Sequence, residues 1–141
     1  MSDLNSRIDD LIDEFELLDD WEERYKYLID LGRALPPLED AERCDANKVK
    51  GCVSQVWLIL DEADGRYVLR GDSDAHIVKG LVALLTRLYE GRTAQEALEV
   101  KPREVLNRIG LAEHLSPQRS NGLASMIGVI QQDAKTRAEA A

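Results

Sequence analysis

Cys52 is the residue of this chain best placed to do covalent chemistry. It directly follows Gly51 and opens a run, residues 53–60, that alternates like a strand. Because glycine adopts backbone conformations that other residues avoid, we expect the thiol on a loop at the mouth of a sheet. Lys48 and Lys50 lie just upstream, and positive neighbours stabilise the thiolate, which is the reactive form. The pattern therefore favours Cys52 as an accessible nucleophile.

Three other interpretations of this thiol stay open at the level of the residues. Free cysteine is among the most buried residue types, so Cys52 could be structural, in a plain interaction module. A zinc site would have to recruit Cys44, Cys52, His76 and His114 from scattered elements. A cysteine hydrolase would need either histidine as its base, although neither spacing marks a dyad. We expect Cys44 to be a spectator on the preceding loop, with a Cys44–Cys52 disulfide or metal pair as the alternative.

The elements that position Cys52 include a small antiparallel sheet. Residues 53–60 and 67–69 read as its two strands, and Asp64-Gly65 between them is a strong hairpin signal. The polar segment 38–50 is expected to be the loop that carries the chain into the sheet, with Val49 in a short edge strand.

Amphipathic helices precede and follow this sheet. Apolar residues at helical spacing, with cap and stop signals, mark two helices before the sheet and three or four after it. The signals are Leu4–Leu18, Trp21 to Pro36-Pro37, Asp72-Ser73-Asp74 before Ile77–Leu88 and Gly91, Thr93 with Glu96, Pro102 to Gly110, and Ser116-Pro117 onward, with a fraying tail from Asp133. The order predicts an α+β fold with a sheet of two to three strands and helices packed on one side. We expect residues 1–141 to form a single domain.

Composition narrows the function classes. The chain has 141 residues and a formal net charge of −9, which argues against nucleic-acid binding because phosphates need a lysine and arginine footprint. No apolar run approaches the roughly 20 residues needed to span a bilayer. The acidic, amphipathic N-terminus does not look like a signal peptide. With only two cysteines and no CxxC or HExxH motif, we expect a reducing, cytoplasmic location and no bound metal.

Four blocks of sequence resemble the SufE/CsdE family of sulfur-acceptor proteins in the right order. The block around Cys52 resembles the family's active-cysteine loop. The four blocks are Trp21-Glu22-x-x-Tyr25 through Leu35-Pro36, Gly51-Cys52-x-Ser54-Gln55-Val56-Trp57, Gly71-Asp72-Ser73-Asp74-Ala75 through Leu81, and His114-Leu115-Ser116-Pro117 through Met126-Ile127. Together they span most of the chain, from residue 21 to residue 127.

This resemblance implies a function and a set of site residues. A pyridoxal-phosphate-dependent cysteine desulfurase would hold sulfur as a persulfide, and Cys52 would accept it and stimulate the desulfurase. The sulfur would then pass to an iron–sulfur scaffold, or in CsdE-like relatives to another pathway such as tRNA modification. The resemblance implies partner-binding or loop-supporting roles for Gly51, Gln55, Asp74 and Arg119. It also implies an IscU-like fold, no cofactor on this chain, and a monomer or weak homodimer.

Thiol chemistry agrees with a carrier that is not itself an enzyme. Transfer of persulfide sulfur is a thiol exchange, so the acceptor needs one accessible thiolate and no base of its own. Cluster assembly needs several ligands, commonly four cysteines, and the motif holds only Cys52. The family further suggests a resting state in which the cysteine is tucked into an apolar pocket until a partner docks.

Overall fold

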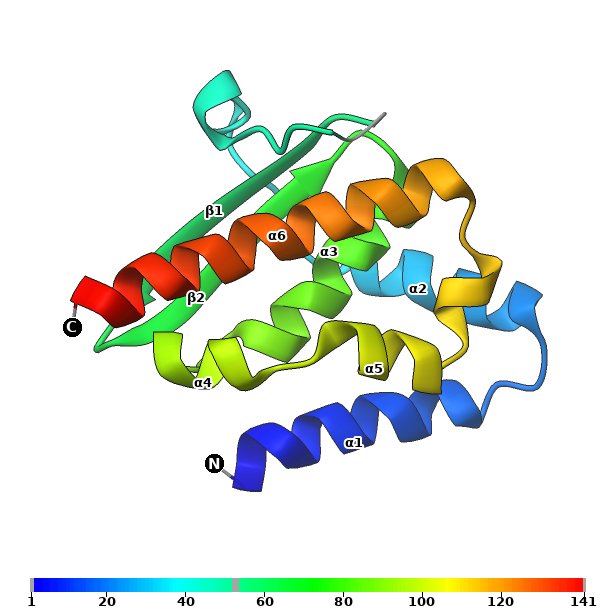
Figure 1. Ribbon diagram of the computed structural model, residues 1–141. Helices are drawn as coiled ribbons and strands as arrows, with labels where there is room; N and C mark the ends of the chain where they lie inside the picture. The colour runs from blue at the N-terminus through cyan, green and yellow to red at the C-terminus, as the bar shows by residue number, and fades with distance from the viewer. Residues whose placement is uncertain (1, 52–53, 141) are drawn as a thin grey trace.

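The computed structural model describes residues 2–51 and 54–140, so Cys52 and Val53 lie outside the described residues. Within these ranges, two helices precede a β-hairpin and four more helices follow it (Figure 1). In chain order the elements are α1 (Ser2–Glu16), α2 (Trp21–Arg33), the 3₁₀ turns η1 (Asp40–Glu42) and η2 (Asp45–Asn47), β1 (Val56–Ala63), β2 (Arg66–Ser73), α3 (His76–Tyr89), α4 (Ala94–Glu99), α5 (Pro102–Arg108), η3 (Leu111–His114) and α6 (Pro117–Ala140). This order confirms the predicted α+β class.

The hairpin forms where Asp64-Gly65 predicted it. Both residues have positive φ, 54° and 75°, as a two-residue primed turn requires. The strands pair in antiparallel register from Val56 opposite Ser73 to the turn. The expected third strand is reduced to one bridge between Lys48 and Trp57, where the Val49 N–H donates to the Val56 carbonyl at 2.8 Å.

The two faces of the hairpin are covered differently. The helices pack on the face that carries Val56, Leu58 and Leu69, and Figure 1 shows α3 and α6 crossing this side. The opposite face carries Arg70 and Asp72, which form ion pairs with residues of the 38–50 loop. Helices on one side of the sheet were predicted correctly. The loop does more than lead into the sheet, because it also shields the other face.

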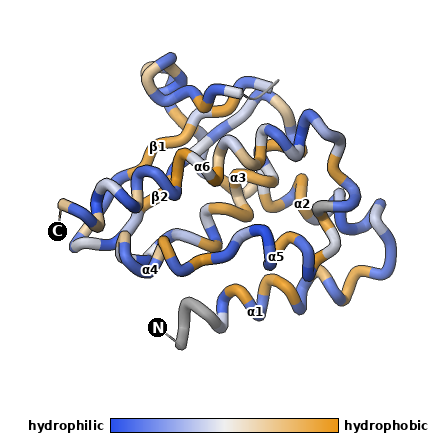
Figure 2. The backbone as a smooth tube through the Cα atoms, viewed as in Figure 1, coloured by the Kyte–Doolittle hydropathy of each residue, from blue (hydrophilic) through white to orange (hydrophobic). Residues whose placement is uncertain are grey.

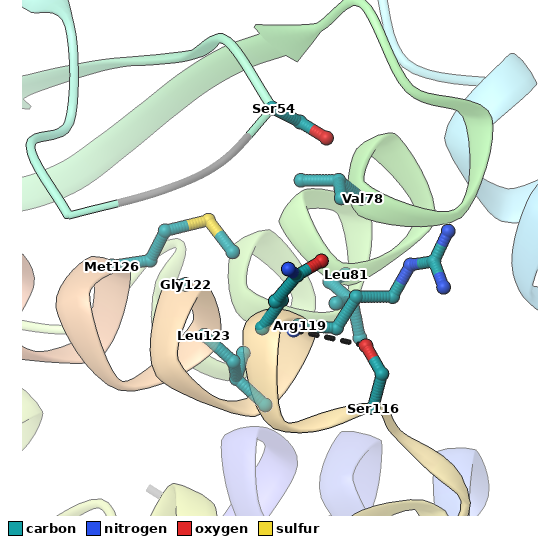
Figure 3. A pocket seen from close by; sticks show the side chains of 9 residues that line it. Ser54, Val78, Leu81, Ser116, Arg119, Gly122, Leu123 and Met126 are labelled. Atoms are coloured by element: carbon teal, nitrogen blue, oxygen red, sulfur yellow. Dashed lines mark hydrogen bonds between the residues drawn. The ribbon is translucent and has the colours of Figure 1, made fainter.

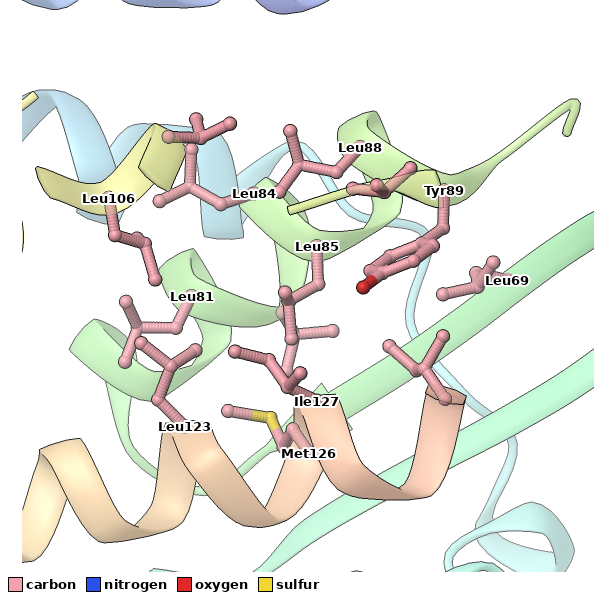
Figure 4. Close-up of a cluster of buried hydrophobic side chains, with 14 of the residues drawn as sticks. Leu69, Leu81, Leu84, Leu85, Leu88, Tyr89, Leu106, Leu123, Met126 and Ile127 are labelled. Carbon is pink, nitrogen blue, oxygen red and sulfur yellow. The ribbon is translucent and has the colours of Figure 1, made fainter. Parts of the chain in front are cut away.

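Helix α3 is the centre of the core. It packs against α2, β2 and α6, and most of its residues are buried. Figure 2 shows hydrophobic and hydrophilic stretches alternating along the backbone, and Figure 4 shows α3 leucines meeting side chains of α6. Leu81, Leu85 and Met126 are each at most 1% exposed. This packing holds α3 and α6 against each other.

Local signals placed most helix ends correctly. Thr93 and Glu96 form the expected capping box, Pro102 opens α5, and Gly91 and Gly110 follow their helices with positive φ. The expected caps for α3 were wrong. Its N-cap is Ala75, with no side-chain bond, because Asp72, Ser73 and Asp74 bond elsewhere.

The start of the first strand was also placed too early. Residues 54 and 55 precede β1 because the Gln55 N–H donates to the side chain of Asp74, just after β2, and not to a backbone carbonyl of the partner strand. The expected fraying from Asp133 was wrong as well, since α6 continues to Ala140. Of the helices that the structure describes, none combines the length and the apolar character that a bilayer-spanning segment requires.

Candidate functional site

Gly51 fixes the upstream end of the Cys52 segment against α6. Its φ of 88° lies in the left-handed region, where a side chain is strained. A Cβ atom at this position would lie 2.7 Å from Ser125 Oγ, closer than real Cβ contacts. The backbone conformation therefore favours glycine here, and a Cβ would also force the Ser125 hydroxyl to move.

Gln55 fixes the downstream end by bonding to the turn between β2 and α3. Its backbone N–H donates to Asp74 Oδ1 at 3.1 Å, and its side-chain Nε2 donates to Oδ2 at 3.3 Å. Its carbonyl accepts from Ser73 Oγ at 2.8 Å and from the Asp74 N–H at 3.2 Å. Two of the predicted site residues, Gln55 and Asp74, are thus in direct contact.

A pocket of about 100 Å³ lies between Ser54 and the first turns of α3 and α6. Figure 3 shows Ser54 across the pocket from the α6 backbone. Buried side chains from α3 and α6 form its floor, and exposed polar side chains form its rim. The floor consists of Val78, Leu81, Leu123 and Met126 with Gly122, and the rim of Ser116, Gln118 and Arg119. The pocket is the size of a small side chain and apolar at its base.

The rim of this pocket is electropositive. Ser116 Oγ accepts the Arg119 N–H at 3.2 Å and caps α6, so the positive end of a 24-residue helix meets the rim. Arg119 adds a full charge there and is exposed. A positive helix end and a guanidinium both favour an anionic sulfur over a neutral thiol. Arg119, predicted as a site residue, therefore lies on the same pocket as Ser54.

Neither histidine lines the pocket. The His114 ring stacks on Trp21 with 3.7 Å between ring centroids, and its carbonyl accepts the Tyr25 hydroxyl. His76 is exposed in the first turn of α3. Neither is among the described residues that line the pocket, so the hydrolase interpretation gains no support.

Cys44 is a free, exposed thiol that accepts a bond from the Asn47 amide at 3.6 Å. Within residues 2–51 and 54–140, no three histidine, cysteine or acidic side chains are grouped so that they could hold a metal ion. The described residues therefore offer no support for the zinc alternative.

Several residues that form the candidate site were not predicted from the sequence. The pocket floor draws on α3 and α6, more than 30 residues apart, and no local pattern signals that they meet. The contact between Gln55 and Asp74 did have a signal. Counting outward from the Asp64-Gly65 turn pairs Val56 with Ser73, which sets Gln55 opposite Asp74. Ser73 could have been found in the same way.

Known proteins resemble this chain in both sequence and fold. The family model named SufE, described as an Fe-S metabolism associated domain, matches residues 9–134. An uncharacterized SufE-like protein of Rhizobium etli is 50% identical over 137 residues, covering 94% of this chain and 93% of the relative. One from Rhizobium meliloti is 46% identical over 134 residues, covering 92% and 96%. The solution structure of a hypothetical protein from Thermus thermophilus has the same fold, with a TM-score of 0.77, 23% identity, and coverage of 94% and 96%.

Proposed function

Because this chain belongs to the SufE family, we propose that it accepts persulfide sulfur from a cysteine desulfurase on Cys52 and passes it on for iron–sulfur cluster assembly. One observation carries the proposal. An apolar pocket with an electropositive rim lies beside Ser54, two residues after Cys52. Such a pocket suits a thiol that must be shielded between transfers and ionised during them.

The proposed transfer is a thiol–persulfide exchange. The Cys52 thiolate attacks the terminal sulfur of the persulfide on the desulfurase cysteine. A new S–S bond forms on Cys52, the old S–S bond breaks, and the desulfurase cysteine leaves as a thiolate. Electrons balance without an oxidant or reductant, and the step needs no base from this chain. Removal of the persulfide frees the desulfurase for another turnover, which accounts for stimulation.

Each predicted site residue has a part in this proposal. Gly51 and Gln55 anchor the two ends of the Cys52 segment, and Asp74 holds Gln55. Arg119 is exposed on the rim, where it can meet an acidic group of the desulfurase. Pyridoxal phosphate belongs to the partner. We place the protein in the cytoplasm, where it acts as a monomer or weak homodimer.

Intact-mass analysis after incubation with a desulfurase, pyridoxal phosphate and cysteine tests the proposal. We expect the wild-type chain to gain one sulfur, Cys52→Ala to gain none, and Cys44→Ala to behave as wild type. The Cys44 variant is the matched control because it removes the exposed thiol that lies outside the motif. Sulfur uptake that survives in Cys52→Ala, or no uptake by the wild-type chain, contradicts the proposal.

The rate of Cys52 alkylation tests separately whether the thiol is shielded in the free protein. Alkylation of Cys52 should be slow in the free protein and faster when the desulfurase is bound. Equal rates would remove the idea of a shielded thiol, while leaving the transfer itself to the mass experiment.

A further inference from the structure

Asp72 is a buried carboxylate beside the candidate site that neither the pocket nor the proposed transfer uses. It lies in β2 on the sheet face that the 38–50 loop covers, and it is 5% exposed. A charge in such a place is costly unless it is paired and hydrogen-bonded. The groups that pair with the Asp72 carboxylate therefore show which parts of the chain it connects.

The carboxylate of Asp72 reaches the downstream end of the Cys52 segment through one residue. Its Oδ1 accepts the Ser73 N–H at 2.8 Å and lies 3.4 Å from Lys79 Nζ. Ser73 Oγ in turn donates to the Gln55 carbonyl at 2.8 Å. Asp72 thus orients Ser73, and Ser73 and the following residue, Asp74, hold Gln55.

The same carboxylate also reaches the upstream loop. Its Oδ2 accepts from Arg43 Nη1 at 2.9 Å. Arg43 is itself held by Asp40, at 2.6 Å. The 38–50 loop continues directly into Gly51, so one carboxylate ties both chain segments that flank residues 52 and 53.

The ionised form of Asp72 is the one that this arrangement stabilises. Burial alone raises the pKa of a carboxyl. The Ser73 N–H, the Lys79 ammonium and the Arg43 guanidinium outweigh burial, and the pKa of Asp72 lies below its ordinary value. The carboxylate keeps its charge, and with it both connections, at neutral pH.

We propose that Asp72, paired with Arg43, is a positioning residue for sulfur transfer that holds the upstream and downstream segments in register and so sets the reactivity of Cys52. This inference rests on the proposed function for its role in transfer. Its geometric content concerns only how readily the thiol reacts, which can be measured without any desulfurase.

A second ion pair in the same region supplies a matched control. Arg70 and Glu42 also join β2 to the 38–50 loop, with Arg70 Nη2 donating to Glu42 Oε1 at 2.8 Å. Arg70 has no bond to the turn that holds Gln55 among the contacts of the described residues. Removing either arginine loosens the loop from the strand, but only Arg43 acts on Asp72.

The experiment compares Asp72→Asn, Arg43→Gln and Arg70→Gln with the wild-type chain. The first readout is the rate of Cys52 alkylation in the free, folded protein, measured in the Cys44→Ala background. We expect Asp72→Asn and Arg43→Gln to raise this rate about tenfold, the factor that follows from losing one charge-assisted hydrogen bond. Arg70→Gln should alkylate at the wild-type rate. Arg43→Lys keeps the positive charge, so it should raise the alkylation rate less than Arg43→Gln does.

The second readout is stimulation of the desulfurase at increasing concentrations of each variant. A positioning role predicts a lower maximal stimulation at an unchanged half-saturating concentration, whereas loss of a docking contact would shift the concentration. Arg43 is partly exposed, so Arg43→Gln decides the matter even if Asp72→Asn does not fold.

Equal alkylation rates in Arg43→Gln, Arg70→Gln and the wild-type chain would overturn the inference. If the wild-type chain accepts no sulfur, the proposed function fails, and the alkylation rates still test the positioning role. If sulfur is accepted and the rates are equal, the proposed function stands and the positioning role is wrong.

Discussion

Gly51 is the residue of the candidate site that has a left-handed backbone conformation among the described residues. A side chain there meets two separate obstacles, the left-handed φ of 88° and the Ser125 hydroxyl. Gly65 in the hairpin turn meets only the first, because its φ is 75° and nothing lies within 4 Å of its Cβ position. A comparison of substitutions at these two glycines therefore distinguishes the cost of the backbone conformation from the cost of the contact with Ser125.

We expect Gly51→Ala to cost more stability than Gly65→Ala. The left-handed conformation alone costs an alanine about 1 to 2 kcal/mol, and the contact with Ser125 adds to this at position 51. Urea unfolding of both variants measures the difference. Gly51→Ala should also speed alkylation of Cys52, and Gly65→Ala should not. Equal unfolding free energies for the two variants would show that the contact with Ser125 has no energetic weight.

Among the elements, α6 is held at its C-terminal end by the hairpin. Asp133 accepts from the Tyr67 hydroxyl at 2.5 Å and from Arg137 Nε at 2.7 Å. Arg137 Nη2 also donates to the Leu60 carbonyl at 2.8 Å, which is how the last turns of a polar helix stay ordered. The end of α6 is thus bonded to both strands.

Arg137→Met should release this end while keeping the apolar stem of the side chain. We expect hydrogen exchange of amides in residues 133–140 to become much faster, with about 1 kcal/mol lost from the global stability. Lys135→Met, at an exposed position of the same turn, is the control and should change neither quantity. Unchanged exchange in Arg137→Met would mean that the Tyr67–Asp133 bond and the packing of Ala134 hold the helix end without Arg137.

The elements also show what the sequence could and could not predict. Asp64-Gly65, Thr93 with Glu96, and Pro102 act through bonds within a few residues, so their turns and caps were predicted correctly. The order in α6 depends on partners in the hairpin more than 60 residues away. Composition alone made the segment after Asp133 look like a fraying tail, because those partners are invisible locally.

The residues of the candidate site also fall into those that the sequence could predict and those that depend on distant contacts. The resemblance of the Cys52 motif to the SufE family pointed to Gly51, Gln55, Asp74 and Arg119, and the hairpin register explains why two of them meet. Burial of Asp72 could not be predicted, because it depends on the 38–50 loop folding back over the sheet. A polar sequence such as this loop gives no signal of the face that it will cover.

At the scale of the whole molecule, the packing of α2 against α3 is close enough to bring their backbones together. A Cβ atom on Gly80 would lie 2.3 Å from the Leu28 carbonyl oxygen, and one on Gly32 would lie 2.7 Å from the Gly80 nitrogen. The obstacles are backbone atoms, which cannot turn aside. This contact fixes the distance between the two helices and supports the α3 face that forms the pocket floor.

Gly80→Ala should therefore be among the most damaging single changes, costing about 3 kcal/mol or more because the two helices must move apart. Gly128→Ala on α6 is the matched control. It lies in a helix with nothing within 4 Å of its Cβ position, so it should gain up to about 1 kcal/mol of stability. Thermal unfolding of both variants checks this, and similar melting temperatures would contradict the close packing.

The whole molecule also has a defined response to pH. The pKa of Asp72 is lowered, and the pKa of Glu14 is lowered by the hydrogen bond from Tyr27, ahead of its contact with Arg87. At the other end of the scale, burial and the hydrogen bond to Asp133 raise the pKa of Tyr67. The carboxyl groups and the phenol therefore all stabilise the fold near neutrality, and their contributions are lost on opposite sides of it.

A carboxyl whose pKa is lower in the folded state stabilises the protein above its ordinary pKa of about 4, and this contribution is lost as the pH falls through the folded value. A tyrosine whose pKa is raised stabilises the protein below about 10, and its contribution is lost as the pH rises above that. Unfolding free energy should hence be greatest near neutrality and fall on both sides. Asp72→Asn should flatten the acid side and leave the alkaline side unchanged, whereas Tyr67→Phe should do the reverse. Urea unfolding across the pH range measures both slopes, and a variant that lowers stability equally at every pH would show that its group contributes through packing and not through its charge.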